Sequence, residues 1–133
     1  MCKVSVIIPN YNGKRYLKDC LEAMKVQSFR DFEILLIDNG SQDGSQEYVE
    51  KAYPWVRLIA LKENTGFCGA VNEGIRNSSS PYVILLNNDT IADKDFVGEL
   101  IRAIEEKPRA FSCQGKLLQM KNKDKIDDAG NYY

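Results

Sequence analysis

The 133-residue chain contains no histidine. Without an imidazole, a histidine-based catalytic triad and an imidazole general base are excluded. A zinc site is disfavoured as well, because zinc is usually held by cysteine and histidine. The cysteines stand far apart and form no C-x-x-C pair: Cys2, Cys20, Cys68 and Cys113. We therefore expect reduced thiols in a cytoplasmic protein.

An excess of one charge and long apolar runs are also lacking. Lysine and arginine together number 18, aspartate and glutamate number 19, and the two signs are interspersed. Such a balance gives no electrostatic signature of binding to nucleic acid or to an anionic membrane. No apolar run reaches the length of a membrane span, and the first residues lack the pattern of a signal peptide. We expect no nucleic-acid partner and a cytoplasmic location, the cytoplasmic face of a membrane included.

Short apolar runs alternate with segments of helical periodicity. The runs at 4–8, 32–37, 56–61 and 82–86 predict buried β-strands, and residues 110–120 are expected to contain at least one more. Strands that alternate with helices of this length predict an α/β fold, with three α/β/α layers around a mostly parallel sheet. No linker or internal repeat interrupts the pattern, so we expect one domain over residues 1–133.

The intervening helices are predicted from apolar residues spaced three or four apart. The four stripes are Leu17, Cys20, Leu21 and Met24; Tyr48, Val49, Ala52 and Tyr53; Phe67, Ala70, Val71, Gly74 and Ile75; and Phe96, Val97, Leu100, Ile101 and Ile104. Asp43 with Gln46 resembles a capping box for the second helix. Asp93 is expected to cap the fourth helix, and Pro108 to end it.

Polar side chains follow each of the first four predicted strands. The segments 10–13, 38–45, 64–66 and 87–89 are rich in asparagine, aspartate, serine and glycine. Because the carboxyl ends of parallel strands share one edge of a sheet, these segments are expected to meet there. The sequence therefore predicts a site for a polar ligand at the carboxyl edge.

The run 82–86 is the one around which this interpretation is organised. It carries no charge, so we expect a strand buried on both faces in the middle of the sheet. It ends at Asn87, Asn88 and Asp89, where a carboxylate flanked by two amides is placed to meet a cation or a hydroxyl-rich ligand. The chain has no G-x-x-x-x-G-K-[ST], no G-x-G-x-x-G after the first strand and no G-x-S-x-G, which argues against a P-loop, a dinucleotide-binding domain and a nucleophile elbow.

Structural explanations remain open for the same residues. Asp89 also fits a cap on a turn, and Asp38 also fits a carboxylate that only stabilises its own loop. Asn10 also fits a residue that satisfies a turn, and Tyr11 an aromatic that packs on the first helix.

Four segments carry a resemblance to a known family. VSVIIPNYNG, FEILLIDNGSQDGS, ENTGFCGAVNEGI and YVILLNNDT are similar, in this order and spacing, to the nucleotide-sugar-binding half of family 2 glycosyltransferases, which have the GT-A fold. They cover nearly all of residues 3–93, and KIDDAGNYY resembles a segment that follows that half. Within the family, LLNNDT most resembles the branch that includes rhamnosyltransferases.

The resemblance implies a set of site residues. Positions that match the family's nucleotide-sugar contacts are Pro9, Asn10, Tyr11, Asp38, Asn64, Gly66, Ala70, Asn72, Asn87 and Asn88. Asp38 matches a carboxylate that accepts a hydrogen bond from the nucleobase. Asp89 matches the last carboxylate of the D-x-D motif, which holds Mg²⁺ or Mn²⁺ against the diphosphate; hard cations prefer such oxygen ligands.

Two departures accompany the resemblance. The first aspartate of D-x-D is Asn87 here, and one fewer negative charge should weaken the metal. The family's carboxylate general base lies well beyond the metal motif, so we expect it beyond Tyr133 and assign no catalytic residue within this chain. We expect a piece of a longer enzyme that keeps the donor-binding half, lacks the acceptor-binding half and is inactive by itself.

The resemblance implies an enzyme of polysaccharide or cell-wall biosynthesis. It is expected to be a metal-binding hexosyltransferase that moves a sugar, with inversion, from a UDP- or dTDP-sugar to a glycan or lipid-linked acceptor. The alternatives are a non-catalytic nucleotide-binding or assembly module of the same fold, and a nucleotidyltransferase. The last would need a basic glycine-rich loop, for which Gly13, Lys14 and Arg15 are too few. The sequence does not indicate the oligomeric state.

Overall fold

A computed structural model describes residues 2–107, 117–118 and 126–128 of the chain. These residues belong to two compact units, Met1–Val26 with Arg30–Ala92, and Gln27–Phe29 with Asp93–Tyr133. The first unit contains β1 (Val4–Asn10), α1 (Lys14–Lys25), β2 (Phe32–Asp38), α2 (Ser45–Ala52), β3 (Arg57–Ala60), α3 (Gly66–Arg76) and β4 (Tyr82–Leu85). The second contains α4 (Phe96–Glu105), β5 (Leu117–Leu118) and β6 (Ile126–Asp128).

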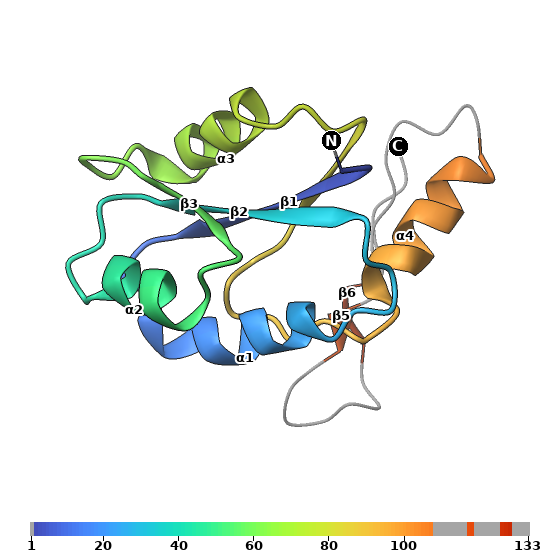
Figure 1. The fold of residues 1–133 in the computed structure, drawn as a ribbon, viewed down its shortest axis with the longest axis horizontal. Helices are drawn as coiled ribbons and strands as arrows, with labels where there is room; N and C mark the ends of the chain where they lie inside the picture. The colour runs from blue at the N-terminus through green and yellow to red at the C-terminus, as the bar shows by residue number, and fades with distance from the viewer. Residues whose placement is uncertain (1, 108–116, 119–125, 129–133) are drawn as a thin grey trace. The chain divides into compact units, whose positions relative to one another are not determined.

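The first unit is a three-layer α/β/α sandwich. Its four strands are all parallel and follow the order β3-β2-β1-β4. Figure 1 shows α3 on one face of this sheet and α1 with α2 on the other. This confirms the fold class expected from the alternation of strands and helices.

Apolar side chains fill both interfaces between the sheet and the helices. Beneath α3, Ile7, Leu35, Ile37 and Ala70 form one fully buried cluster. On the other face, the α1 stripe of Leu17, Cys20, Leu21 and Met24 is buried as its spacing predicts. The burial of such side chains is the main term that stabilises the unit.

The prediction for residues 82–86 is wrong in one respect. Within the described residues, β4 pairs only with β1 and lies at an edge of the sheet. Ile84 and Leu86 are buried, whereas Val83 and Leu85 are exposed. An uninterrupted apolar run does not reveal whether one face or both faces will be covered, because side-chain alternation is visible only when polar residues mark one face.

Two of the other helix stripes were also predicted too broadly. In α2, Val49 is buried but Ala52 is exposed. In α3, Ala70, Val71 and Gly74 are buried, whereas Phe67 and Ile75 are exposed.

The second unit is built differently from the prediction at the start of α4. The helix begins at Phe96, and Asp93 does not cap it with its side chain. Instead, Val97 N donates to Gln27 Oε1 at 3.0 Å, and Gln27 Nε2 donates to Asp93 O at 2.6 Å. A glutamine distant in sequence thus satisfies a helix N–H group that would otherwise lack an acceptor. The strand expected within residues 110–120 corresponds to β5, which pairs antiparallel with β6; the rest of that segment lies outside the described residues.

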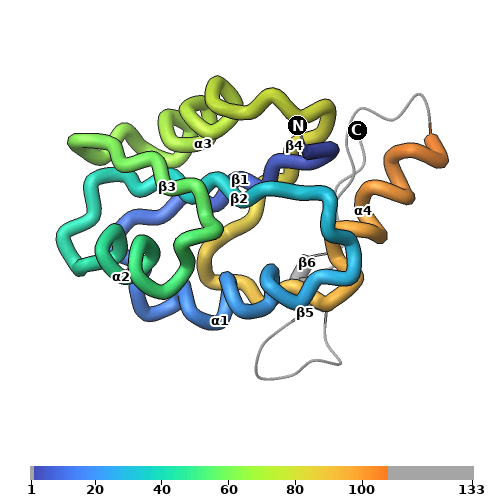
Figure 2. The backbone as a smooth tube through the Cα atoms, viewed as in Figure 1, coloured from blue at the N-terminus to red at the C-terminus, as the bar shows by residue number. Residues whose placement is uncertain are grey.

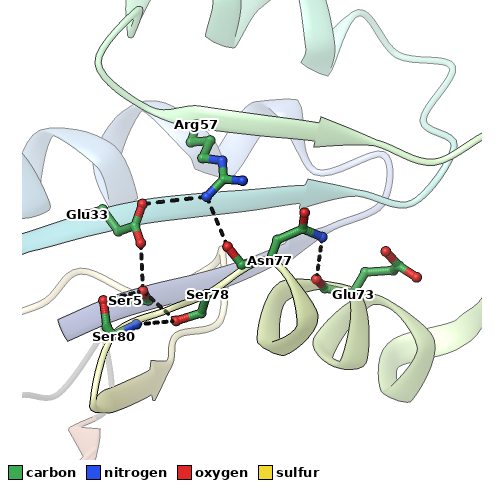
Figure 3. A network of polar contacts seen from close by, with 7 residues as sticks. All are labelled: Ser5, Glu33, Arg57, Glu73, Asn77, Ser78 and Ser80. Carbon is green, nitrogen blue, oxygen red and sulfur yellow. Dashed lines mark hydrogen bonds and ion pairs between the residues drawn. The ribbon is translucent and has the colours of Figure 1, made fainter. Parts of the chain in front are cut away.

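The two edges of the parallel sheet differ in character. At the carboxyl edge, the turns after β1, β2 and β3 come together on the left of Figure 2. Toward the amino edge, Ser5 Oγ donates to Glu33 Oε2 at 2.8 Å and, with its one proton used there, accepts from Ser80 Oγ at 2.8 Å. Arg57 Nη1 donates to Asn77 O at 2.9 Å and lies 3.8 Å from Glu33 Oε1 (Figure 3). This network holds the starts of the strands together and is separate from the carboxyl edge.

No helix within the described residues combines the length and the apolar character needed to cross a membrane.

Candidate functional site

A cavity of about 390 Å³ opens at the carboxyl edge of the parallel sheet. Ligand sites commonly have volumes of about 300–1,000 Å³, so it can hold a small molecule. Its wall comes from the ends of β1, β2 and β4 and from the start of α3. The lining residues are Pro9, Asn10, Tyr11, Asn39, Asn64, Gly66, Phe67, Asn87, Asn88 and Asp89.

Most of the predicted site residues lie at the wall of this cavity, but some do not. The cavity brings together Pro9, Asn10, Tyr11, Asn64, Gly66, Asn87, Asn88 and Asp89. It does not bring Asp38, Ala70 or Asn72 to its wall. Ala70 is fully buried in the cluster under α3, and Asn72 lies exposed on α3. Residues beyond Tyr133, where the general base is expected, lie outside this chain.

Asp38 ends β2 and is completely buried. Its Oδ1 accepts from Asn10 Nδ2 at 2.9 Å and from Ser41 Oγ at 2.7 Å. Its Oδ2 accepts from Ser41 N at 3.0 Å and from Gln46 Nε2 at 2.7 Å. A carboxylate offers about four lone-pair positions, so these four donors use its whole acceptor capacity. Gln46 is therefore not part of the capping box predicted with Asp43.

Asp43 has a wider task than its spacing predicts. Its Oδ2 accepts from Lys14 N at 2.9 Å at the start of α1, and its Oδ1 accepts from Ser45 N at 3.0 Å and from Ser45 Oγ. Burial raises the pKa of Asp43, but these hydrogen bonds from Ser45 and Lys14 outweigh it and leave the pKa below its usual value. Asp43 thus accepts from the first N–H group of both α1 and α2, while Gly44 with a φ of +85° stands at the N-cap of α2.

Asn10 ends β1 and forms part of the cavity floor. Its Nδ2 faces Asp38, and its Oδ1 accepts from Asn88 Nδ2 at 2.8 Å. Gly13 lies directly against this pair: a Cβ there would be 2.2 Å from Asn88 Nδ2 and 2.6 Å from Asn10 Oδ1. Glycine at position 13 leaves the space that the Asn10–Asn88 contact occupies, and a Cβ there would displace one of the two amides.

Asn39 joins the end of β2 to the start of α3. Its Oδ1 accepts from Thr65 N at 2.8 Å and Thr65 Oγ1 at 3.0 Å, and its Nδ2 donates to Gly66 O at 2.9 Å. Gly66 has a φ of +80°, a conformation that glycine adopts without strain. At Gly69, a Cβ would lie 2.4 Å from Thr65 Oγ1, so glycine leaves room for the threonine. These contacts fix the loop that forms one wall of the cavity.

The start of α3 favours an anionic ligand. No acidic residue lies in its first turn, and its N-cap residue, Thr65, makes no side-chain cap hydrogen bond. Gly66 N donates to Asn64 Oδ1 at 2.8 Å, but the dipole and the remaining N–H groups of a helix N-terminus attract phosphate-like groups. Gly66 and Phe67 at this terminus line the cavity, so an anion in the cavity would meet it.

Asp89 supplies the one carboxylate among the described residues that line the cavity. Within residues 2–107, 117–118 and 126–128, no group of three or more histidine, cysteine, aspartate or glutamate side chains is arranged to hold a metal. A magnesium or manganese ion therefore fits only as a shared ion, held by Asp89 and by the oxygens of a bound diphosphate. Hard cations often bind in this way, through one or two carboxylates and substrate phosphates.

Cys20 lies beneath the Asn87–Asp89 turn and takes no part in such a site. Its Sγ donates to Asn87 O at 3.8 Å. Burial, together with the negative charge of Asp89, raises the pKa of the Cys20 thiol to about 12. At neutral pH the sulfur therefore stays protonated and is neither a nucleophile nor a metal ligand.

Sequence reasoning missed two lining residues. Asn39 stood next to the predicted Asp38, and Phe67 was counted as a core residue because it falls on the helical period. The exposed fractions of Tyr11 and Phe67 are 51% and 58%, so each presents an aromatic surface at the cavity. The signal that could have identified Phe67 was an aromatic residue directly after the polar segment 64–66.

The described residues of the first unit also line hollows away from this edge. One of about 580 Å³ is lined by Asn12, Lys14, Arg15, Asp43 and Tyr48. Another of about 240 Å³ lies at the amino edge beside Trp55 and Met24. Neither holds a residue of the Asn87–Asp89 motif, so the carboxyl-edge cavity is the candidate site.

Comparison with known proteins agrees with this geometry. A sequence model described as "Glycosyl transferase family 2" matches residues 5–128. The putative teichuronic acid biosynthesis glycosyltransferase TuaG of Bacillus subtilis is 29% identical over 127 residues, or 93% of this chain and 50% of TuaG. The chain spans between 13% and 50% of the lengths of the curated relatives that it matches.

Two solved structures share the fold. S. aureus TarS 1-349 in complex with UDP has a TM-score of 0.71 and 26% identity, over 78% of this chain and 32% of that one. The mannosyltransferase PcManGT from Pyrobaculum calidifontis, in complex with GDP-Man and Mn²⁺, has a TM-score of 0.70 and 22% identity, over 77% of this chain and 32% of that one. The parallel sheet with its flanking helices is the GT-A fold of these neighbours.

Proposed function

The chain belongs to glycosyl transferase family 2, and we propose that its described residues form the donor half of the active site. This half binds a nucleotide-diphosphate sugar, a UDP- or dTDP-sugar, at the carboxyl-edge cavity. With the acceptor half it transfers a hexose, with inversion, to a glycan or lipid-linked acceptor in cell-wall or polysaccharide synthesis. The reaction takes place in the cytoplasm or at the cytoplasmic face of the membrane. The rhamnosyltransferase-like branch stays a prediction.

One observation supports this proposal most directly. A single cavity joins two exposed aromatic rings, a helix N-terminus and the Asn87–Asp89 motif. The rings of Tyr11 and Phe67 suit a nucleobase, for which stacking is worth about 1–3 kcal/mol. The helix N-terminus and Asp89 with a divalent cation suit the two ends of a diphosphate. TarS, which shares the fold at 26% identity, was solved with UDP.

Magnesium or manganese is the proposed cofactor, with Asp89 as the protein carboxylate that holds it. When bound there, the ion supplies positive charge that neutralises the departing nucleoside diphosphate. The side chains of Asn87 and Asn88 stand beside this carboxylate and offer amide oxygens as further ligands or as acceptors for ribose hydroxyls. The contacts predicted from the family for Asp38, Ala70 and Asn72 stay predictions.

A specific observation also favours a second function for the chain by itself. Apart from Asp89, no acidic residue of the described part lines the cavity, so no carboxylate is placed there to deprotonate an acceptor hydroxyl. A chain with a donor cavity and no base fits a nucleotide-binding module that does not transfer sugar alone. A turnover assay with a UDP-sugar and a glycan acceptor separates the two functions, because the module alone would release no UDP above the solvent rate.

The proposal is tested by a thermal-shift titration with UDP, dTDP and GDP, each with Mn²⁺ or with EDTA. A ligand at 100 times its dissociation constant should stabilise the fold by about 2.7 kcal/mol, which corresponds to about 10 °C at this chain length. We expect one nucleotide to give a shift that needs Mn²⁺ and is lost in Asp89→Ala. Asp31→Ala, which removes an exposed carboxylate at the amino edge, serves as the matched control and should keep the shift. A shift that survives in Asp89→Ala, or no shift with any nucleotide, would contradict the proposed donor site.

A further inference from the structure

Three side chains from three strand ends form one hydrogen-bonded relay at the carboxyl edge. Asp38 at the end of β2 contacts Asn10 at the end of β1, and Asn10 contacts Asn88 after β4. The two bonds measure 2.9 Å and 2.8 Å. Asp38 is fully buried and Asn10 is 2% exposed, whereas Asn88 lies at the cavity wall next to Asp89. The relay therefore runs from the interior of the unit to the motif.

The chemistry of Asp38 gives this relay a direction. A carboxylate can only accept, so the amide of Asn10 must turn its Nδ2 toward Asp38. The Oδ1 of Asn10 then faces Asn88, and Asn88 must turn its own Nδ2 inward to donate. Ser41 and Gln46 hold Asp38 through both of its oxygens, which prevents the carboxylate from turning away.

The consequence appears at the outer end of the relay. Because Asn88 Nδ2 donates inward to Asn10, Asn88 Oδ1 is left as an acceptor on a residue that lines the cavity with Asp89. In the described part of the chain, no buried side-chain nitrogen or oxygen lacks a hydrogen-bond partner, so this unbonded oxygen lies open to solvent. Gly13 keeps the space that the Asn10–Asn88 contact occupies.

We infer that Asp38 is a positioning residue: through Asn10 it turns the amide of Asn88 so that its oxygen, with Asp89, faces the cation and diphosphate. This inference rests on the proposed donor site for its ligand, but not for the relay itself. It gives the buried Asp38 a task that needs no contact with the nucleobase. An amide oxygen is a hard ligand and suits the proposed cation, whereas an amide NH₂ group would repel it.

The first test examines the direction of the relay without any ligand. Asn88→Asp places a carboxylate oxygen against Asn10 Oδ1, and Asp38→Asn removes the group that orients Asn10. Each change leaves buried polar groups mismatched and should raise the unfolding equilibrium constant about tenfold or more. In the double variant Asn10 can turn over, accept from position 38 and donate to position 88. The unfolding equilibrium constant of the double variant should therefore be smaller than the value obtained by multiplying the effects of the two single changes.

The second test measures the cation response of UDP binding. Asn10→Ala and Asp38→Asn should raise the Mn²⁺ concentration for half-maximal UDP binding by about 10- to 100-fold, as the loss of an orienting contact behind a metal ligand typically does. UDP affinity of Asp38→Asn at saturating Mn²⁺ should change less than threefold, because Asp38 does not line the cavity. A residue that only stabilises the fold would not separate these two quantities.

Ser5→Ala is the matched control for both tests. Ser5 lies in the same strand as Asn10, is fully buried and makes side-chain hydrogen bonds, but it belongs to the amino-edge network of Figure 3. It should lower stability and leave the Mn²⁺ midpoint unchanged.

The outcomes separate the two proposals. The relay is overturned if the effects of Asp38→Asn and Asn88→Asp on the unfolding equilibrium constant simply multiply in the double variant. It is also overturned if Asn10→Ala and Ser5→Ala need the same Mn²⁺ concentration for half-maximal UDP binding. If the wild-type chain binds neither UDP nor dTDP in the presence of Mn²⁺, the donor-site proposal fails, and the stability cycle still decides whether the relay exists.

Discussion

Gly74 lies where α3 packs most closely on the sheet, and replacing it by alanine should destabilise the protein. A Cβ at this position would lie 2.6, 2.9 and 3.0 Å from Ile7 Cγ2, Cδ1 and Cγ1. Distances below about 3.0 Å force a displacement. Ile7 has little freedom to move, because it is fully buried and packs with Leu35, Ile37 and Ala70.

Two opposing effects set the size of the loss. Alanine is favoured over glycine inside a helix by about 1 kcal/mol. Overpacking a dense core costs about 1–3 kcal/mol, and three contacts with one immobile side chain place Gly74→Ala near the upper end. The net destabilisation should be about 2 kcal/mol, or a fall in Tm of about 8 °C at this chain length.

Urea denaturation, followed by circular dichroism and by fluorescence of the single tryptophan, Trp55, measures this change. Two probes are needed because coincident transitions justify a two-state free energy for a chain with two compact units. Gly98→Ala in α4 is the matched control: its Cβ would lie 3.4 Å from Phe29 Cβ, an ordinary contact. It should be neutral or stabilising by up to about 1 kcal/mol.

A substitution at Ile7 tests whether contact with this side chain causes the loss of stability. Ile7→Ala removes all three atoms that the new Cβ would meet, although it is itself costly, at about 2–5 kcal/mol. In that background Gly74→Ala should no longer destabilise and should gain its helix propensity. If Gly74→Ala costs the same with and without the Ile7 side chain, contact with Ile7 is not the cause and the reasoning is wrong.

Two further predictions concern the candidate site and the pH dependence of stability. Phe67→Ala should weaken UDP binding about 5- to 150-fold, because the stacking of the ring on the base is lost. Ile75 is an exposed apolar residue of the same helix outside the cavity, so Ile75→Ala should leave UDP binding unchanged. Equal losses of affinity in the two variants, measured by a binding titration, would contradict a role for the Phe67 ring. Asp43→Asn should lower the free energy of unfolding at neutral pH. A carboxylate with a depressed pKa stabilises the folded state only while it is ionised. The difference from wild type should therefore vanish as the pH falls through the lowered pKa of Asp43, which lies below the ordinary value of about 3.9. The effect should be small, since the side chain is largely accessible to solvent. The prediction is refuted if the difference between the urea midpoints of wild type and variant stays constant from pH 7 to pH 2.5.

Local patterns were enough to predict the order of elements and the composition of the carboxyl edge. The stripe from Leu17 to Met24 is buried as expected, because helical period and burial are linked by backbone geometry alone. The gathering of Asn10, Asn64 and Asn87–Asp89 at one cavity was predictable for a similar reason, since parallel strands place all their carboxyl ends on the same side.

Local patterns failed where the partner came from elsewhere in the chain. Phe67 keeps the helical period yet faces the cavity, because α3 covers the sheet with a narrower face than its apolar stripe. Asp43 accepts from the first N–H group of α1 as well as from that of α2, and Gln46 donates to Asp38 rather than back to its own helix. Capping motifs are defined by sequence spacing, but a hydrogen bond depends on which acceptor lies nearest in space.

The sequence by itself determined which polar residues stand at the strand ends; the tertiary structure alone decided how they are connected. The order β3-β2-β1-β4 places β1 between the other two strands of the relay. Asn10 therefore lies within hydrogen-bonding distance of Asp38, 28 residues away, and of Asn88, 78 residues away. The bond between Asp38 and Asn10 follows from that order, because only strand pairing brings these two side chains together, whereas the other three donors to Asp38 come from Ser41 and Gln46 shortly after β2.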